Sequence, residues 1–188
     1  MIRYTANRTF KEAFKAEDIM YTDFENCIFD GCDFTACNFT GVVFIDCVFR
    51  DCNFASAKIH YVALRGAAFI ACDFTDVNFA MVDPLLFDIS FTDCVLDYAK
   101  FYTLKLPRTV FTNCSIVASD FMASDLTDAI FDRCNLHKTV FIDTIANKTD
   151  FTTSFNFTID PEKNKLKKAM FSKDGLIGLL AKHEIIVK

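Results

Sequence analysis

Cysteine and histidine are the residues of this 188-residue chain whose types could support metal binding or nucleophilic chemistry. Cys27, Cys32 and Cys37 are each separated by four residues, whereas common zinc sites use a two-residue spacer between paired cysteines. The five glycines are dispersed and form no phosphate-binding loop. The histidines have no nucleophile or acid placed to work with them; they are His60, His137 and His183. These patterns predict no catalytic residue, no metal site and no cofactor.

The cysteines instead mark a repeat of five residues. From Phe24 to Phe79, and again from Phe91 to Phe151, an apolar residue recurs at every fifth position, which we call the central position. All nine cysteines lie two residues before a central residue, at what we call the small position. The other three positions are mostly polar. A period of five fits neither an α-helix nor a β-strand, so the backbone must turn within every unit.

A second period of twenty residues shows how many units complete one coil. Cys94, Cys114 and Cys134 are twenty residues apart, as are Cys32, Cys52 and Cys72, and large and medium central residues alternate in the second half of the chain. Four units therefore make a square coil, and coils stack at the roughly 4.8 Å spacing of paired strands. Stacked thiols such as Cys32 and Cys52 would be close enough for a disulfide. In the cytosol we expect them to stay reduced and to fill space as small apolar groups.

The repeated motifs CDFTA, CNFTG, CVFRD and SDLTD resemble those of the pentapeptide repeat family, over about residues 19–151. The resemblance implies an all-β solenoid, a right-handed quadrilateral β-helix of about 20 residues per coil, with a filled interior and no pocket. We therefore expect an N-terminal capping coil at 1–21, a β-helix at 22–153 with a register slip near 80–85, and a C-terminal cap at 154–188. Because nothing in such an interior could desolvate a substrate, we expect no enzyme.

Both ends depart from the repeat, as the caps of a solenoid should. Residues 9–20 fit either an irregular first coil or a short helix capped by Thr9, with Glu12 three residues later. At the other end we expect a surface loop from Thr152 to Lys165 and a short α-helix over about residues 173–182, capped by Ser172.

The apolar residues of the C-terminal segment have two interpretations. They either cover the last coil or form a twofold dimer interface; they are Leu176, Leu179, Leu180, Ile185 and Val187. The segment GLLAKHEIIVK loosely resembles the dimer-forming C-terminus of the Qnr and MfpA branch of the family, which implies a homodimer.

The net charge and hydropathy of the chain indicate which kinds of partner it is expected to bind. The net charge is −5, no apolar run is long enough to span a membrane, and the N-terminus lacks the apolar core of a secretory signal. These features predict a cytoplasmic protein with no membrane contact and no direct binding to nucleic acid. A basic protein partner is favoured instead.

The predicted β-helix is acidic, with 18 acidic against 9 basic residues between positions 22 and 153. One wall of the square is expected to collect Asp23, Glu25, Asp46, Asp88, Asp125 and Asp128. Resemblance to the Qnr and MfpA branch implies a DNA mimic that binds type II topoisomerases, DNA gyrase or topoisomerase IV, and protects them from quinolones. The alternative is a scaffold for an unknown protein partner, using an apolar patch formed by Tyr98, Tyr102 and Leu104.

Overall fold

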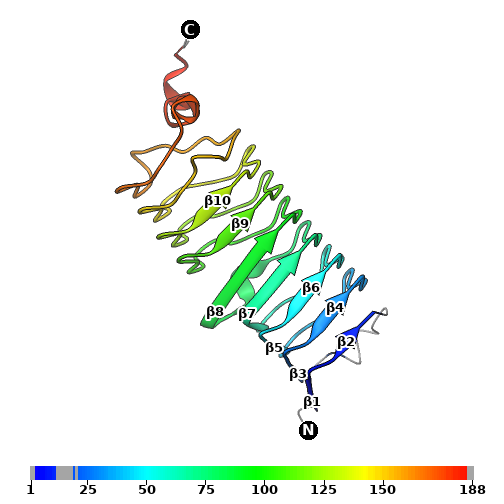
Figure 1. The fold of residues 1–188 in the computed structure, drawn as a ribbon. Coiled ribbons are helices and arrows are strands. Elements are labelled where there is room, and N and C mark those ends of the chain that lie inside the picture. Colours follow the sequence, from blue (N-terminus) through cyan, green and yellow to red (C-terminus); the bar gives the residue numbers. More distant parts are fainter. Residues whose placement is uncertain (1–2, 12–18, 20, 186–188) are drawn as a thin grey trace.

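A computed structural model describes residues 3–11, 19 and 21–185, without the side chains of 86 and 87. The chain winds in stacked coils from one end of a column to the other (Figure 1). The strands are β1 (Arg3–Ala6), β2 (Thr9–Phe10), β3 (Thr22–Glu25), β4 (Ile28–Asp30), β5 (Val43–Ile45), β6 (Val48–Arg50), β7 (Ala63–Ile70), β8 (Asp83–Thr92), β9 (Val110–Thr112) and β10 (Ile130–Asp132). Three 3-10 helices complete the elements: η1 (Phe79–Met81), η2 (Asp174–Leu179) and η3 (Ala181–His183).

Successive coils pair in parallel with the predicted register of twenty residues. Val43 of β5 lies between Asp23 and Ala63, and Phe131 of β10 pairs with Phe111 of β9. Isolated bridges such as Lys100 to Asp120 continue the register outside the strands. The fold is therefore the quadrilateral β-helix that the repeat predicted.

The four walls are named here by their central residues. Wall A contains Phe24, Phe44, Leu64, Leu106, Leu126 and Ala146. Wall B contains Phe29, Phe49, Phe69, Phe91, Phe111, Phe131 and Phe151. Wall C contains Phe34, Phe54, Phe74, Leu96, Ile116 and Leu136. Wall D contains Phe39, Ile59, Phe79, Phe101, Phe121 and Phe141.

Corners form because the residue two positions after most central residues adopts a left-handed conformation. The non-glycine residues that do so have φ between 50° and 62°. Asparagine, aspartate and glycine tolerate this region, and they occupy many corners, including Asn26, Gly31 and Asp46. Corner amides also donate to the next coil, as Asp46 N does to Arg65 O at 2.8 Å. Much of the aspartate in the repeat therefore serves the turn itself.

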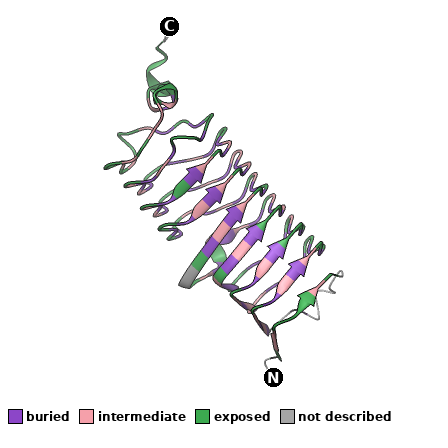
Figure 2. Cartoon of the chain, viewed as in Figure 1, coloured by how far each residue is buried: buried purple, intermediate pink, exposed green. Residues whose placement is uncertain are grey.

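Central rings fill the interior. Phe111 is fully buried and stacks on Phe91 and Phe131, with centroid distances of 5.3 and 4.7 Å. Edge contacts to Phe101 and Phe121, at 6.2 and 6.1 Å, join the ladders of walls B and D. Figure 2 shows the buried segment recurring along the successive strands of the column. The rings leave a void of about 10 Å³, room for no more than one water.

All nine cysteines are free and buried at the small position. Most of the thiols donate to backbone carbonyl oxygens: Cys47 Sγ, for example, lies 3.5 Å from Phe24 O of the preceding coil. Serine and threonine take over this bond in later coils, as Ser119 Oγ does with Leu96 O at 2.6 Å. Burial raises the pKa of Cys47 to about 12 and that of Cys32 to about 11. The predicted role of the thiols as core filler is confirmed.

An insertion of two residues interrupts the register in β8. Asp83 pairs with Ala63 and Asp88 with Arg65, so β8 advances five residues while β7 advances two. β8 then advances by one residue while β7 advances by two, and Phe91 returns to its place over Phe69. Wall A is consequently widened between Asp83 and Asp88.

The N-terminal end continues the coil at least to Phe10. β1 pairs with β3, and β2 pairs with β4, so Thr9 lies in a strand. Residues 12–18, where the alternative helix would fall, lie outside the described residues.

The C-terminal cap corrects two sequence predictions. The segment after Thr152 is not merely a surface loop, because Phe157 and Ile159 are buried. The ring centroids of Phe157 and Phe171 lie 5.5 Å apart. In the described residues the cap contains no α-helix but the 3-10 helices η2 and η3. Two glycines disfavour an α-helix here, and a Cβ at Gly178 would lie 2.3 Å from Phe157 O.

Two polar contacts stabilise the cap internally. Ser172 Oγ accepts from Gly175 N at 3.0 Å, the interaction expected of a cap, although it precedes a 3-10 helix. Lys182 Nζ lies 3.0 Å from Asp160 Oδ1 and 2.6 Å from Glu162 Oε2. The Glu162 amide, followed by Lys182, lowers the pKa of Asp160. Over the described residues, no helix is long and apolar enough to cross a membrane.

Candidate functional site

The outer surface is where this molecule can recognise a partner, since aromatic rings and thiols fill the interior. His60, His137 and His183 are all exposed. Among the described residues, no group of three or more histidines, cysteines or acidic side chains is placed to hold a metal ion.

The six acidic residues predicted to share a wall lie along wall A and its edges. Asp23 and Glu25 belong to β3, at the N-terminal end, whereas Asp125 and Asp128 lie several coils away. Basic residues stand between and beside them on the same wall: Arg65, Lys105, Arg108 and Lys148. Lys148 Nζ lies 3.4 Å from Asp128 Oδ1. Wall A therefore presents alternating rather than uniform charge.

Several of these six side chains also have a local structural role. Asp46 and Asp128 are left-handed corner residues. Asp125 Oδ1 accepts from Thr127 N at 3.0 Å and from Thr127 Oγ1 at 2.6 Å. Tyr4 OH donates to Glu25 Oε2 at 2.6 Å, and this bond raises the pKa of Tyr4. Turn geometry thus accounts for part of the acidic pattern.

A second row of carboxylates follows the corner between walls B and C. We call it the acidic edge; its members are Asp30, Asp33, Asp51, Asp73, Asp93 and Asp132. Bridges from Asp33 through Asn53 to Asp73 and Val95 place successive coils in one column. From the first to the last of its coils, the edge spans roughly 24 Å at the strand spacing. Basic residues of the described part of the chain also lie along it: Lys11 Nζ is 3.5 Å from Asp30 Oδ2, Arg133 pairs with Asp132 at 3.0 Å, and Arg50 follows a wall B centre.

Hydrogen bonds fix several carboxylates of the acidic edge. Asp33 Oδ1 accepts from Thr35 N at 3.0 Å, and Asp73 Oδ1 accepts from Thr75 N at 2.8 Å. The Thr35 hydroxyl and amide lower the pKa of Asp33, which is therefore ionised at neutral pH. Grouping the sequence by wall places Asp30, Asp51, Asp93 and Asp132 together on wall B, with Asp150, but leaves Asp33 and Asp73 on another wall. Side chains that follow a wall B centre meet those that precede a wall C centre.

The predicted apolar patch is only partly present. Tyr98 is exposed and Tyr102 is half-buried, but Leu104 is buried, with 5% of its surface exposed. Leu104 occupies the small position before Leu106, so its side chain points inward. The inclusion of Leu104 in an exposed patch was wrong.

The C-terminal cap exposes apolar side chains at the end of the column. Leu176, Leu180 and Ile185 are exposed, whereas Leu179 packs against the core. Ile177, which the sequence analysis did not single out, is 53% exposed. Val187 lies outside the described residues.

Solved structures with a similar fold include two trypsin-treated forms of QnrB1, a plasmid-mediated fluoroquinolone resistance protein. The first is 15% identical with a TM-score of 0.67, covering 98% of this chain and 100% of that chain. The second is 16% identical with a TM-score of 0.50, covering 100% of both. HetL, a pentapeptide repeat protein involved in heterocyst differentiation regulation in the cyanobacterium Nostoc, is 12% identical with a TM-score of 0.31, covering 93% of this chain and 88% of that one.

No curated protein sequence matches the chain. Two family models do match it: "Pentapeptide repeat region" over residues 17–84 and "Pentapeptide repeats (8 copies)" over residues 119–154. Together they cover more than half of the chain, and both describe the five-residue period that builds the four walls. The chain belongs to the pentapeptide repeat family.

Proposed function

We propose that this chain is a non-catalytic DNA mimic that binds the basic DNA-binding surface of a type II topoisomerase, DNA gyrase or topoisomerase IV. The acidic edge is the observation that carries the proposal. It places a row of carboxylates along a narrow column whose interior is packed with aromatic rings. Lysine and arginine groups that neutralise DNA phosphates would pair with such a row.

Hydrogen bonds already fix several carboxylates of the acidic edge in place, and this favours binding. Asp33 and Asp73 accept hydrogen bonds from the threonine two residues later, and Asp93 Oδ1 accepts from Asn113 Nδ2 at 2.5 Å. Side chains already fixed lose little rotamer freedom when a partner docks. Binding should therefore come mainly from charge and should weaken as salt rises.

Similarity to QnrB1 supports the choice of target. QnrB1 is a fluoroquinolone resistance protein with the same fold, and we extend quinolone protection of a topoisomerase to this chain as part of the proposal. Such a target would place the chain in the cytoplasm, where nine free thiols would stay reduced.

A homodimer through the C-terminal cap completes the proposal. The exposed apolar side chains at this end would be buried by a second copy: Leu176, Ile177, Leu180 and Ile185. A twofold interface there would lengthen the column and present two acidic edges. Light scattering should give twice the mass of the chain, and a Leu176→Glu, Ile177→Glu variant should give the single-chain mass.

The functional test is a gyrase supercoiling assay, with and without a quinolone, using two matched variants. The acidic-edge variant replaces Asp33, Asp51, Asp73 and Asp93 by asparagine. The wall A variant makes the same change at Asp23, Asp46, Asp125 and Asp128. Both variants change the net charge equally, and asparagine keeps a side-chain acceptor and tolerates a left-handed corner.

We expect the native chain and the wall A variant to inhibit supercoiling or to relieve quinolone inhibition, and the acidic-edge variant to lose the effect. Loss only in the wall A variant would move the binding site to the six residues first predicted. If the native chain has no effect at several-fold excess, the DNA-mimic proposal is wrong.

A protein-binding scaffold is the second candidate, and exposed aromatic residues on and beside wall D favour it. Tyr21, Tyr61 and Tyr98 are between 56% and 69% exposed. Binding through these rings would respond little to salt, which separates it from binding through the acidic edge.

A further inference from the structure

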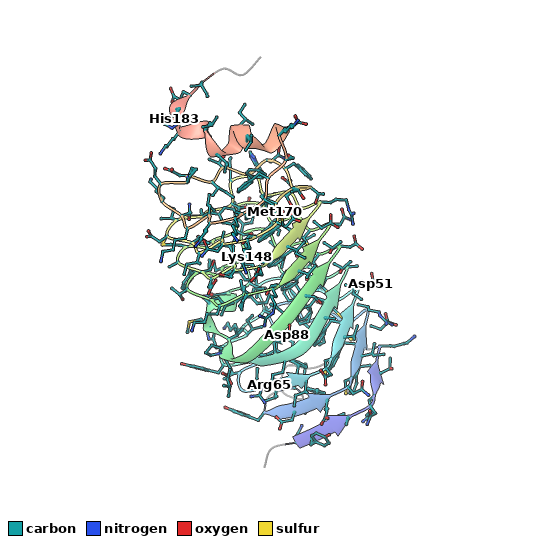
Figure 3. All side chains as sticks on the ribbon, turned by 60° about the vertical axis from the view of Figure 1, so that its left-hand side comes forward. Asp51, Arg65, Asp88, Lys148, Met170 and His183 are labelled. Carbon is teal, nitrogen blue, oxygen red and sulfur yellow. The ribbon has the colours of Figure 1, made fainter. Side chains whose placement is uncertain are left out.

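The widened part of wall A contains a hollow that is separate from the acidic edge. Its volume is about 430 Å³, and it is lined chiefly by Asp46, Arg65, Gly66, Asp88, Pro107 and Arg108. Arg65 and Asp88 come from the paired strands β7 and β8, as Figure 3 shows. The hollow lies at the coil where β8 carries its extra residues, so the insertion creates it.

The charged groups of this hollow are not paired with one another. Arg65, Arg108, Asp46 and Asp88 form no ion pair within 4.0 Å in the described part of the chain, although Lys148 and Asp128 do so on the same wall. Arg65 Nε is buried without a hydrogen-bond partner, the one side-chain nitrogen or oxygen of the described residues in this state. A buried donor left unpaired is destabilising, so a movement of the Arg65 side chain that gives Nε an acceptor is favoured.

Gly66 makes room for one of the carboxylates. Its φ is 68°, and a Cβ built there would lie 2.4 Å from Asp46 Oδ1. The Asp46 carboxylate therefore occupies the space that a side chain at position 66 would need. Both carboxylates and both guanidinium groups can then face the same hollow.

The balance of charge indicates the class of ligand. Two guanidinium groups attract an oxyanion, because a guanidinium can offer two parallel N–H donors to a carboxylate. Two neighbouring carboxylates repel a polyanion such as a phosphate ester and attract an ammonium group. We propose that the hollow binds a small zwitterion of the α-amino acid class, with the ligand carboxylate on Arg65 and Arg108 and its ammonium group toward Asp46 and Asp88.

Nuclear magnetic resonance can test this directly through the Nε–Hε signals of the arginines. Each of the twenty common L-amino acids is titrated into the labelled full chain, beside sodium chloride, sodium acetate and methylammonium chloride at matched ionic strength. At least one amino acid should shift the Arg65 and Arg108 signals saturably, and should do so more than acetate. The Arg133 signal is the control, because that side chain pairs with Asp132 at a distant corner.

Two variants separate the zwitterion from a simple anion. Arg65→Lys keeps the charge but removes Nε, and should weaken amino acid binding about tenfold or more, read from the Arg108 signal. Asp88→Asn should weaken amino acid binding and strengthen acetate binding. The proposal is overturned if no amino acid shifts the Arg65 signal beyond the salt control, if Arg133 shifts equally, or if acetate binds as tightly as the best amino acid.

Discussion

Truncation of Phe111 to alanine should destabilise the column more than any surface change. Phe111 is fully buried, stacks on Phe91 and Phe131, and touches Phe101 and Phe121 edge-on. Buried phenylalanine to alanine changes cost about 3–5 kcal/mol. We expect the upper half of that range, because rings above and below are held at the coil spacing and cannot close the gap.

For a protein of this length a loss of 3–5 kcal/mol corresponds to a fall in Tm of roughly 6 to 20 °C. Circular dichroism during thermal unfolding measures it, and urea unfolding gives the matching free energy. Lys105→Ala is the control, since Lys105 is exposed, does not lie at a left-handed corner, and should change stability by less than about 0.5 kcal/mol. Equal falls in Tm for the two variants would refute the reasoning that the ring ladder holds the coils together.

Three further predictions concern the corners, the cap and the thiols. Gly66→Ala should be more destabilising than Gly31→Ala, because both glycines have positive φ but only at position 66 would a Cβ press against Asp46. Equal losses in the free energy of unfolding, measured in urea, would show that this clash does not contribute. The lowered pKa of Asp160 means that its contribution to stability is present above the unfolded pKa of a carboxyl group and is lost as the pH falls through the folded pKa. The protection of η2 and η3 against hydrogen exchange, taken relative to the intrinsic exchange rate at each pH, should therefore fall in acid. Lys182→Met should raise that exchange already at neutral pH, and unchanged exchange would show that the ion pair does not hold the cap. A thiol reagent should leave all nine cysteines unmodified in the native chain and modify them in denaturant; rapid native labelling would contradict their burial.

The period of the sequence was sufficient to predict the architecture. A spacing of five between central residues and of twenty between thiols leaves few ways to turn the backbone, and Phe91, Phe111 and Phe131 lie where that arithmetic put them. The same rule should have marked Leu104 as buried, because it precedes Leu106 by two positions.

The charged surface was harder to predict because a corner joins residues of two walls. Asp30 follows a central residue of wall B and Asp33 precedes one of wall C, so a wall-by-wall list separates neighbours. The hollow at Arg65 was also hidden, since its position depends on where β8 takes up its two extra residues. The slip is visible in sequence, but the pairing of Asp88 with Arg65 is not.

The 3-10 helices of the C-terminal cap could not be predicted from the sequence for a different reason. Asp174 and the leucines that follow resemble a capped α-helix, yet Gly175 and Gly178 are needed against Phe157. Tertiary packing thus overrides the local pattern and produces 3-10 turns.

The most direct test of a DNA-mimic function is the salt dependence of binding to DNA gyrase. The native chain, the acidic-edge variant and the wall A variant would each be titrated at several salt concentrations, from about 50 to about 200 mM, where charge-driven contacts weaken steeply. We predict that log Kd rises steeply with log salt for the native chain and the wall A variant, and that the acidic-edge variant binds weakly with a shallow slope. Binding that is independent of salt and equal in all three proteins would contradict the account.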